Sequence, residues 1–400
     1  MGDNMGDNIA DEQEALVPAD PRSPVRLIPS DRPSDGPEEG IALCLSGGGY
    51  RAMLFHLGAL WRLHETGVLP TIKRISSVSG GSITAGAVAL AWPKLAGHSD
   101  RQSFERNVVA PIRTLASHTI DIASTVIGLL PGMSVSKRIA AAYDKHVFKG
   151  ATLQSLPDEP RFVINATSVQ TGTLWRFSKP YMANYRVGMI EKPDVALSAA
   201  VTASSAFPPF LSPMQMPLDP ARVKFVKGAD LHREPYISNA VLTDGGVYDN
   251  LGLETAWKNY DTILVSDGGG HFAPEEDPAR DWGRHSYRVL NLIDSQVRAL
   301  RQRQVIDSYD APETDRNHRK GTYWGIRGNI ANYVVDGVLP CPLDRTKELA
   351  DVPTRLAAMN DALQERLVNW GYAICDAALR RRVIGSGAQP APKFPYGGGV

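Results

Sequence analysis

The chain has 400 residues, of which 43% are apolar and 22% charged, so it can bury a large core and is neither fibrous nor disordered throughout. Its 43 basic and 43 acidic side chains balance, which excludes a chain-wide positive field, and we expect no nucleic-acid partner. The three cysteines, Cys44, Cys341 and Cys375, are too few for a disulfide framework and lack metal-ligand spacing, which favours a reducing compartment or indifference to it. We expect a cytoplasmic protein without a bound metal. The sequence predicts neither a spanning helix nor a cleaved secretory signal.

Both ends of the chain are expected to lie outside the folded domain. Residues 1–37 are acidic and proline-rich, which predicts a disordered, solvated tail. Residues 384–400 are rich in glycine and proline and predict a second flexible tail. The sequence therefore predicts one domain over residues 38–383, with a helical insertion near 100–146 that interrupts it.

Buried strands and helices alternate through the domain. An apolar run at 41–45 predicts a strand, and apolar residues between Met53 and Trp61 at helical spacing predict a helix that stops near Gly67. A second strand and helix are expected at 74–78 and 83–92, with Pro93 ending the helix. Further strands are predicted at 162–165, 241–243 and 262–266, and further helices at 195–204, 251–258, 287–304, 354–367 and 370–381. This alternation is typical of an α/β fold in which helices cover both faces of a parallel sheet.

The helix expected at 287–304 has a marked apolar side. Five of its apolar residues recur at helical spacing and share one face: Val289, Leu292, Ile293, Val297 and Leu300. The sequence predicts the face but not what it contacts.

The first segment with candidate chemistry is Ser46-Gly47-Gly48-Gly49-Tyr50-Arg51, which lies between the first strand and the first helix. Three successive glycines leave backbone N–H groups uncovered at the positive end of a helix, and this arrangement suits an anion. The anion could be a phosphate or a transient oxyanion, and a simple tight turn is the alternative.

The second segment, Ser76-Ser77-Val78-Ser79-Gly80-Gly81-Ser82, follows the second strand. A serine between a strand and a helix, with small residues around it, can be held in a sharp turn that exposes its hydroxyl, as in the G-x-S-x-G nucleophile elbow. Ser79 is the serine in that frame, Ser77 replaces the first glycine and Gly81 is the last. The alternative for Ser79 is a helix cap.

The third segment, Thr243-Asp244-Gly245-Gly246-Val247, places a carboxylate after another apolar strand. Asp244 would lie at the same edge of the sheet as the two glycine-rich turns and could accept a proton from a nucleophile. A β-turn is the alternative, and Ser266-Asp267-Gly268-Gly269-Gly270-His271 competes for the same role.

Together the segments resemble the patatin-like phospholipases, in the bacterial type of the domain. That family has a G-G-G-x-[RK] loop, a G-x-S-x-G elbow about thirty residues later and a D-G-[GA] element far downstream, and all three match here in order. Ala203 to Phe210 also resembles the A-S-x-A-x-P-x-x-F segment of the family. The resemblance implies a three-layer fold with a mostly parallel central sheet, related to the α/β-hydrolases.

The resemblance also implies the roles of the residues. Ser79 and Asp244 would form a catalytic dyad without metal or cofactor, and an acyl-enzyme on Ser79 would be hydrolysed by water. The oxyanion would be held by Gly47, Gly48 and Gly49, while Arg51 would brace their loop or contact a lipid phosphate. The implied activity is that of a phospholipase A or lysophospholipase, and the implied substrate is a phospholipid or lysophospholipid.

Several alternatives stay open. His271 or His56 could complete a triad, although the resemblance argues against a catalytic histidine. A dinucleotide site could use Gly47, Gly49 and Ala52, but the acidic residue that it needs after the second strand is missing. A catalytically silent lipid-binding or scaffold protein could keep the same fold.

Peripheral contact with a membrane is a further open expectation. The apolar stretch 119–133 could be a lid, an interfacial anchor or an ordinary core helix, and it lacks a basic face. Arg380, Arg381 and Arg382 could touch anionic headgroups or simply end a solvated helix.

Overall fold

The computed structural model describes residues 37–95, 100–121, 135–315, 317–385 and 390–400. Nearly all of the predicted tail at 1–37 lies outside these residues, as does most of the apolar stretch 119–133. Within the described ranges, residues 100–146 contain the helices α4 (Arg101–Phe104), α5 (Ala110–Ala116) and α7 (Val135–Tyr143) and the π segments η2 (Glu105–Val109) and η3 (Asp144–Phe148). All structural statements below refer to these residues.

Ten strands form one sheet with the order β10-β9-β1-β2-β3-β4-β5-β6, and β8 pairs with both β3 and β7. The strands are β1 (Glu38–Leu45), β2 (Ile72–Val78), β3 (Arg161–Ser168), β4 (Thr173–Phe177), β5 (Tyr181–Asn184), β6 (Gly188–Glu191), β7 (Met214–Pro217), β8 (Asn239–Asp244), β9 (Tyr260–Asp267) and β10 (Lys320–Gly325). From β10 to β3 the neighbours run parallel, whereas β4 to β8 pair antiparallel. The five predicted strands are all present, and the sequence missed β4 to β7 and β10.

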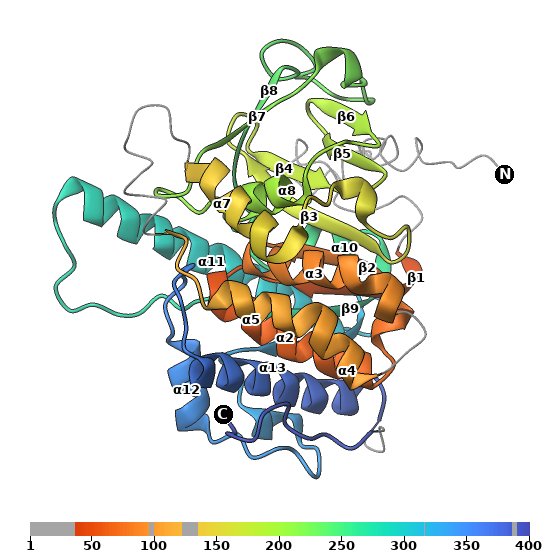
Figure 1. Cartoon of the computed structure of the whole chain (residues 1–400), viewed down its shortest axis with the longest axis vertical. Helices are drawn as coiled ribbons and strands as arrows, with labels where there is room; N and C mark the ends of the chain where they lie inside the picture. Colours follow the sequence, from red (N-terminus) through yellow and green to blue (C-terminus); the bar gives the residue numbers. More distant parts are fainter. Residues whose placement is uncertain (1–36, 96–99, 122–134, 316, 386–389) are drawn as a thin grey trace.

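Helices cover both faces of this sheet (Figure 1). They are α2 (Gly49–Glu65), α3 (Gly80–Leu95), α4 (Arg101–Phe104), α5 (Ala110–Ala116), α7 (Val135–Tyr143), α8 (Leu197–Ser204), α9 (Gly246–Asp249), α10 (Glu254–Trp257), α11 (Trp282–Asp310), α12 (Leu343–Ala350) and α13 (Asp361–Arg382). Short 3-10 or π segments are η1 (Leu69–Thr71), η2 (Glu105–Val109), η3 (Asp144–Phe148), η4 (Leu153–Ser155), η5 (Pro220–Arg222) and η6 (Ile330–Tyr333).

The alternation of side chains along β1 divides the core into two layers. Leu43 and Leu45 join the large cluster under α2, α3 and α13, while Ala42 and Cys44 join the smaller cluster under α10 and α11. Both sets are fully buried, because parallel strands carry helices on both faces. The predicted three-layer α/β fold with a mostly parallel central sheet is therefore confirmed.

Three predictions about the helices and the end of the chain are corrected by the structure. The helices expected at 354–367 and 370–381 are one helix, α13, which begins only at Asp361, after its cap Asn360. Gly371 does not interrupt it and lets it pack closely on α2, since a Cβ on Gly371 would lie 1.9 Å from the Phe55 carbonyl oxygen. Pro93 lies inside α3 instead of ending it, because the buried side chains of Trp92 and Leu95 hold this turn against the core. The predicted flexible tail is wrong for residues 390–400, since Asn369 Nδ2 donates to the carbonyls of Tyr396 and Gly399.

Candidate active site

The register of β3 brings the ends of β2 and β8 together. β2 pairs with β3 as far as Val78, opposite Asn165, and β8 pairs with β3 from Asp244, opposite Ala166. Because β4 occupies the other edge of β3 over these residues, β8 continues the edge that β2 leaves, in the opposite direction. The carboxyl ends of β2 and β8 therefore approach each other along this edge of β3. This brings Ser79, the residue after β2, next to Asp244, the last residue of β8.

The Ser79 side chain lies near the Asp244 carboxyl, and its interaction with that carboxyl acts to lower the pKa of Asp244. Both residues are buried, and Asp244 Oδ1 also accepts the N–H of Gly246 at 2.7 Å. Burial raises the pKa of Asp244 to about 7, the hydrogen bond from Gly246 and the interaction with Ser79 moderate the rise, and the nearby charge of Asp294 adds to it. The carboxylate is thus a far stronger base than a solvated aspartate.

Ser79 lies in a strained, tightly packed turn. Its φ is +51°, in the left-handed region that a side chain rarely adopts. The two glycines that follow allow close approach: a Cβ on Gly80 would lie 2.2 Å from the Gly49 carbonyl oxygen, and one on Gly81 would lie 2.5 Å from the Leu45 carbonyl oxygen. This is the geometry predicted for an elbow, and it joins the serine turn to the glycine loop.

Hydrogen bonds from neighbouring serine side chains hold this turn in place. Ser204 Oγ accepts the backbone N–H of Ser79 at 2.9 Å and is paired with Ser82 Oγ at 2.9 Å. Ser77 lies in β2, next to its last residue Val78, and its hydroxyl donates to the Val163 carbonyl at 3.3 Å. Ser204 belongs to the segment that the sequence analysis singled out, but its contact with Ser79 was not predicted.

The backbone N–H groups of the three loop glycines differ in their availability. The N–H of Gly47 donates to the backbone carbonyl of Asn250 at 3.0 Å and to its Oδ1 at 3.1 Å. Gly48 and Gly49 have φ of +141° and +61°, and in the described part of the chain their N–H groups have no hydrogen-bond partner. The expectation that Gly47 is a free donor is therefore wrong in this conformation, because Asn250 occupies it, and two bare N–H groups remain at the start of α2.

Arg51 holds the loop in place. Its buried guanidinium donates to the Gly268 carbonyl from Nε and Nη2, each at 3.1 Å, to Thr354 Oγ1 at 2.9 Å and to the Val352 carbonyl. Burial lowers the pKa of Arg51 to about 10, so it stays charged at neutral pH. Of the two predicted roles, these contacts favour bracing.

The glycines after Asp244 have separate roles in the packing. A Cβ on Gly245 would lie 2.3 Å from the Asn165 carbonyl oxygen, so only glycine fits against β3 there. Gly246 begins α9, and its N–H is the one that Asp244 Oδ1 accepts. Both residues of the predicted D-G-G element thus position the carboxylate.

Asp267 and His56, the alternatives to Asp244 and to a catalytic histidine, already have other hydrogen-bond partners. Burial tends to raise the pKa of Asp267, but Arg298, the Tyr323 hydroxyl at 2.7 Å and the Gly269 N–H at 2.8 Å hold it below its usual value. Both ring nitrogens of His56 are bonded within the core, to Ser266 Oγ at 2.8 Å and the Ser46 carbonyl at 2.9 Å, and burial lowers the pKa of His56 to about 4.

His271 is exposed in the loop after β9, and among the described residues no contact joins it to the dyad. Asn250 is the functional residue that the sequence analysis missed. It follows Asp244 by six residues, and nothing in a single sequence marks it as the partner of Gly47.

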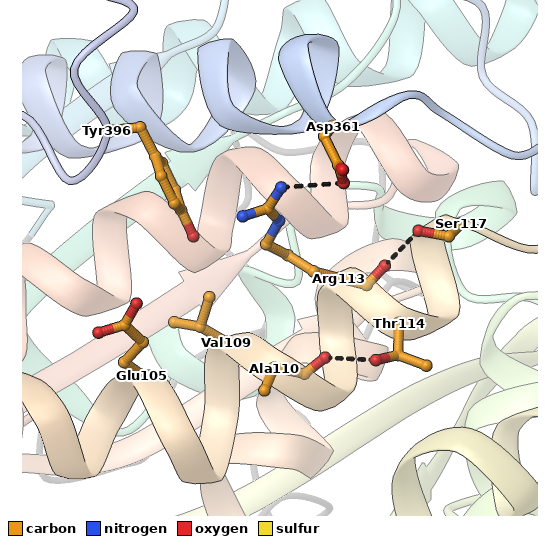
Figure 2. A pocket seen from close by; sticks show the side chains of 8 residues that line it. All are labelled: Glu105, Val109, Ala110, Arg113, Thr114, Ser117, Asp361 and Tyr396. Atoms are coloured by element: carbon orange, nitrogen blue, oxygen red, sulfur yellow. Dashed lines mark hydrogen bonds and ion pairs between the residues drawn. The ribbon is translucent and has the colours of Figure 1, made fainter.

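A shallow polar depression lies elsewhere on the molecule. It has a volume of about 370 Å³ and is lined by Glu105, Val109, Ala110, Arg113, Thr114, Ser117, Asp361 and Tyr396 (Figure 2). Its lining comes from η2, α5, the start of α13 and the C-terminal segment, and none of the predicted site residues is among them. The depression is therefore separate from the Ser79 turn.

The fold and the turn define an α/β protein with a serine at a strand-turn-helix elbow and a carboxylate beside it. The family model of the patatin-like phospholipases matches residues 43–257, more than half of the chain, and the chain belongs to that family. No curated protein matches it in sequence.

Solved structures resemble the chain mainly in their fold. Human GIVD cytosolic phospholipase A2 in complex with methyl gamma-linolenyl fluorophosphonate and terbium chloride is 12% identical, with a TM-score of 0.50, and the match covers 86% of this chain and 58% of that chain. VipD from Legionella pneumophila is 14% identical with a TM-score of 0.38, covering 85% and 66%. The type III effector protein ExoU is 12% identical with a TM-score of 0.33, covering 88% and 56%. The chain thus spans less than two thirds of the length of each.

Proposed function

We propose that the protein hydrolyses the carboxylic esters of phospholipids or lysophospholipids, with Ser79 as nucleophile and Asp244 as its base. The observation that carries this proposal is the register of β3, which brings Ser79 next to the buried Asp244 carboxyl, whose pKa burial raises to about 7. A carboxylate with a pKa near 4 is a feeble base for a serine hydroxyl, whereas one near 7 is matched to neutral pH. Desolvation thus supplies the basicity for which a triad uses histidine.

The proposed reaction has two steps. Ser79 Oγ attacks the acyl carbonyl while Asp244 takes its proton, and the N–H groups of Gly48 and Gly49 donate to the oxyanion that forms. The tetrahedral intermediate collapses, the ester oxygen leaves with the proton from Asp244, and the acyl group stays on Ser79. Water then attacks this ester with Asp244 again as base, which releases the fatty acid and restores the serine hydroxyl. The cycle needs no metal and no cofactor.

A serine-reactive probe tests the proposal and separates it from a silent lipid-binding scaffold. We expect a fluorophosphonate probe to label the wild-type protein on Ser79, with no labelling of Ser79→Ala and labelling slowed by about 100-fold or more in Asp244→Asn. Peptide mass mapping locates the label, and fatty-acid release from phospholipid vesicles, unchanged by EDTA, provides the activity. An unlabelled wild type that binds lipid would identify the scaffold instead.

The role of Arg51 can be tested by its effect on two substrates. Lysine keeps the charge of Arg51 but cannot span Gly268, Thr354 and Val352 with one rigid fork, so Arg51→Lys should loosen the glycine loop. We expect kcat/KM to fall by about tenfold on both p-nitrophenyl butyrate and a phospholipid, as for the loss of one or two charge-assisted hydrogen bonds. A fall confined to the phospholipid would mean that Arg51 binds the phosphate.

A further inference from the structure

The segment between α12 and α13 lies directly on the glycine loop. The carbonyl oxygen of Arg355 accepts the N–H of Tyr50 at 3.0 Å. A Cβ on Gly49 would lie 2.6 Å from that oxygen and 2.9 Å from the Arg355 nitrogen, so the loop and the segment are in contact there. Arg51 ties the same segment to the loop through Thr354 Oγ1 at 2.9 Å. The segment therefore places Arg355 beside one of the two glycines proposed to hold the oxyanion.

Gly49 also contacts the turn of the proposed nucleophile. A Cβ on Gly80, the residue after Ser79, would lie 2.2 Å from the Gly49 carbonyl oxygen and 3.1 Å from the Gly49 nitrogen. The backbone of Gly49 therefore touches the Ser79 turn and Arg355 alike. A ligand group held by Arg355 would lie close to the oxyanion donors without competing with the oxyanion for their N–H groups.

The carboxylate of Asp121 orients the Arg355 guanidinium. Asp121 Oδ2 accepts Arg355 Nε at 3.0 Å and the backbone N–H of Leu356 at 3.2 Å, so one carboxylate fixes both the side chain and the backbone of the segment. The Arg355 side chain is 49% exposed, and among the described residues its two Nη groups have no acceptor. An oriented fork of N–H groups thus remains for a ligand.

Asp121 is also close to the dyad, through Tyr143. Burial raises the pKa of Tyr143, and the charges of Asp244 and Asp121 both add to the rise. Both carboxylates therefore lie within electrostatic reach of one buried hydroxyl, which is paired with Ser205 Oγ at 3.1 Å. The contacts at Gly49 and at Tyr143 thus place the ion pair near the dyad independently of each other.

Other charged groups near this segment have partners in the protein. Asp351 accepts from Arg327 at 2.7 Å, and Asp361, at the start of α13, accepts from Arg113 at 3.1 Å. Since Asp121 balances the charge of Arg355, any attraction for an anion comes from directed hydrogen bonds more than from net charge. Phosphate is the anion that suits such a fork, because two of its oxygens can each accept one N–H.

We propose that Arg355 binds the phosphodiester of the lipid headgroup and so selects phosphate-bearing esters over neutral glycerides. This inference rests on the proposed function and names the feature of the substrate that the site recognises. In a glycerophospholipid the phosphate and the scissile ester are attached to one glycerol unit, so the group that binds the phosphate must lie close to the oxyanion donors. Arg355 has this place, on the far side of Gly49 from the Ser79 turn.

Two soluble esters with the same acyl chain test this proposal, because hexanoyl lysophosphatidylcholine carries the phosphate and monohexanoylglycerol lacks it. Arg355→Gln should raise KM for the lysophospholipid by about tenfold or more with little change in kcat, as for the loss of charge-assisted hydrogen bonds. Its rates on monohexanoylglycerol and p-nitrophenyl butyrate should equal those of the wild type, which also shows that it is folded. Arg355→Lys, which keeps the charge without the fork, should lie between the two.

The matched control is Arg345→Gln. The Arg345 side chain is 48% exposed and pairs with Glu348 on α12, so its loss removes a similar ion pair and should change none of these rates. An equal loss by Arg355→Gln on both esters would overturn the proposal, because Arg355 would then only hold the segment on the loop. An unchanged KM for the lysophospholipid, or the same change in Arg345→Gln, would also overturn it.

Calorimetric titration in the Ser79→Ala background separates binding from chemistry. Ser79→Ala should bind the lysophospholipid at least about tenfold more tightly than Ser79→Ala/Arg355→Gln, and it should bind inorganic phosphate far more weakly. Equally tight binding of inorganic phosphate would assign the site to free phosphate and overturn the headgroup assignment. If no protein hydrolyses any of the esters while Arg355 still controls binding of the lysophospholipid, headgroup recognition stands and the proposed function fails.

Discussion

Replacing Ser79 by alanine is expected to lower kcat/KM for ester hydrolysis by roughly 10⁴-fold or more, because it removes the hydroxyl that attacks the acyl carbonyl in the proposed reaction. Asp244→Asn keeps the shape of the side chain and its bond to the Gly246 N–H, but the amide cannot take up the Ser79 proton. We expect a loss of roughly 10³- to 10⁴-fold for this variant. Since both residues act in the same proton transfer, the double variant should be no worse than Ser79→Ala alone. Initial rates with p-nitrophenyl butyrate measure all three.

His271→Ala provides the control for this prediction. His271 is the histidine that could complete a triad in the chain order Ser, Asp, His, and it is exposed in the structure. We expect its replacement to leave the rate unchanged. A large loss in His271→Ala would replace the dyad by a triad, and an Asp244→Asn variant within tenfold of the wild type would remove Asp244 from the mechanism.

Strands β1, β2, β3, β8 and β9 could be predicted from the sequence because each contains a run of apolar residues. The antiparallel strands β4 to β7 and the edge strand β10 could not. β7 is four residues long and alternates buried with exposed positions, and β10, Lys320–Gly325, is polar and becomes a strand only through its pairing with β9. Such short edge strands depend on neighbours far away in the chain, and local periodicity does not reveal them.

The candidate site, like the fold, could be predicted from the sequence only in part. Ser79 and the glycine loop follow the parallel strands β2 and β1, which bring their turns to one edge of the sheet, whereas Asp244 ends β8, which runs antiparallel to β3. The occupation of the Gly47 N–H by Asn250 depends on a contact between residues 203 positions apart, and the sequence carries no local sign of it. For α11 the spacing predicted which residues share a face, but whether that face meets protein or solvent depends on the tertiary packing alone.

The raised pKa of Asp244 means that its ionised form destabilises the folded protein. Its pKa is near 3.8 when unfolded and about 7 when folded, so between these values the folded state keeps a proton that the unfolded state has released. The free energy of unfolding therefore falls by about 1.4 kcal/mol for each pH unit in this window, and the full penalty is present above pH 7. Catalysis needs the same ionised form, so activity should rise with pH through about 7 while this contribution to stability is lost.

Asp244→Asn should accordingly stabilise the protein at pH 8 more than at pH 5. The amide carries no charge to bury at either pH, so we expect its gain in the free energy of unfolding over the wild type to be larger at pH 8 by about 2–3 kcal/mol, as the pKa difference implies. Urea unfolding followed by circular dichroism at both pH values measures this difference. Asp277→Asn is the control, because this exposed carboxylate should give no change at either pH. An equal effect of Asp244→Asn at the two pH values would show that Asp244 is not held near neutral pKa by burial, and the dyad would then lack its base.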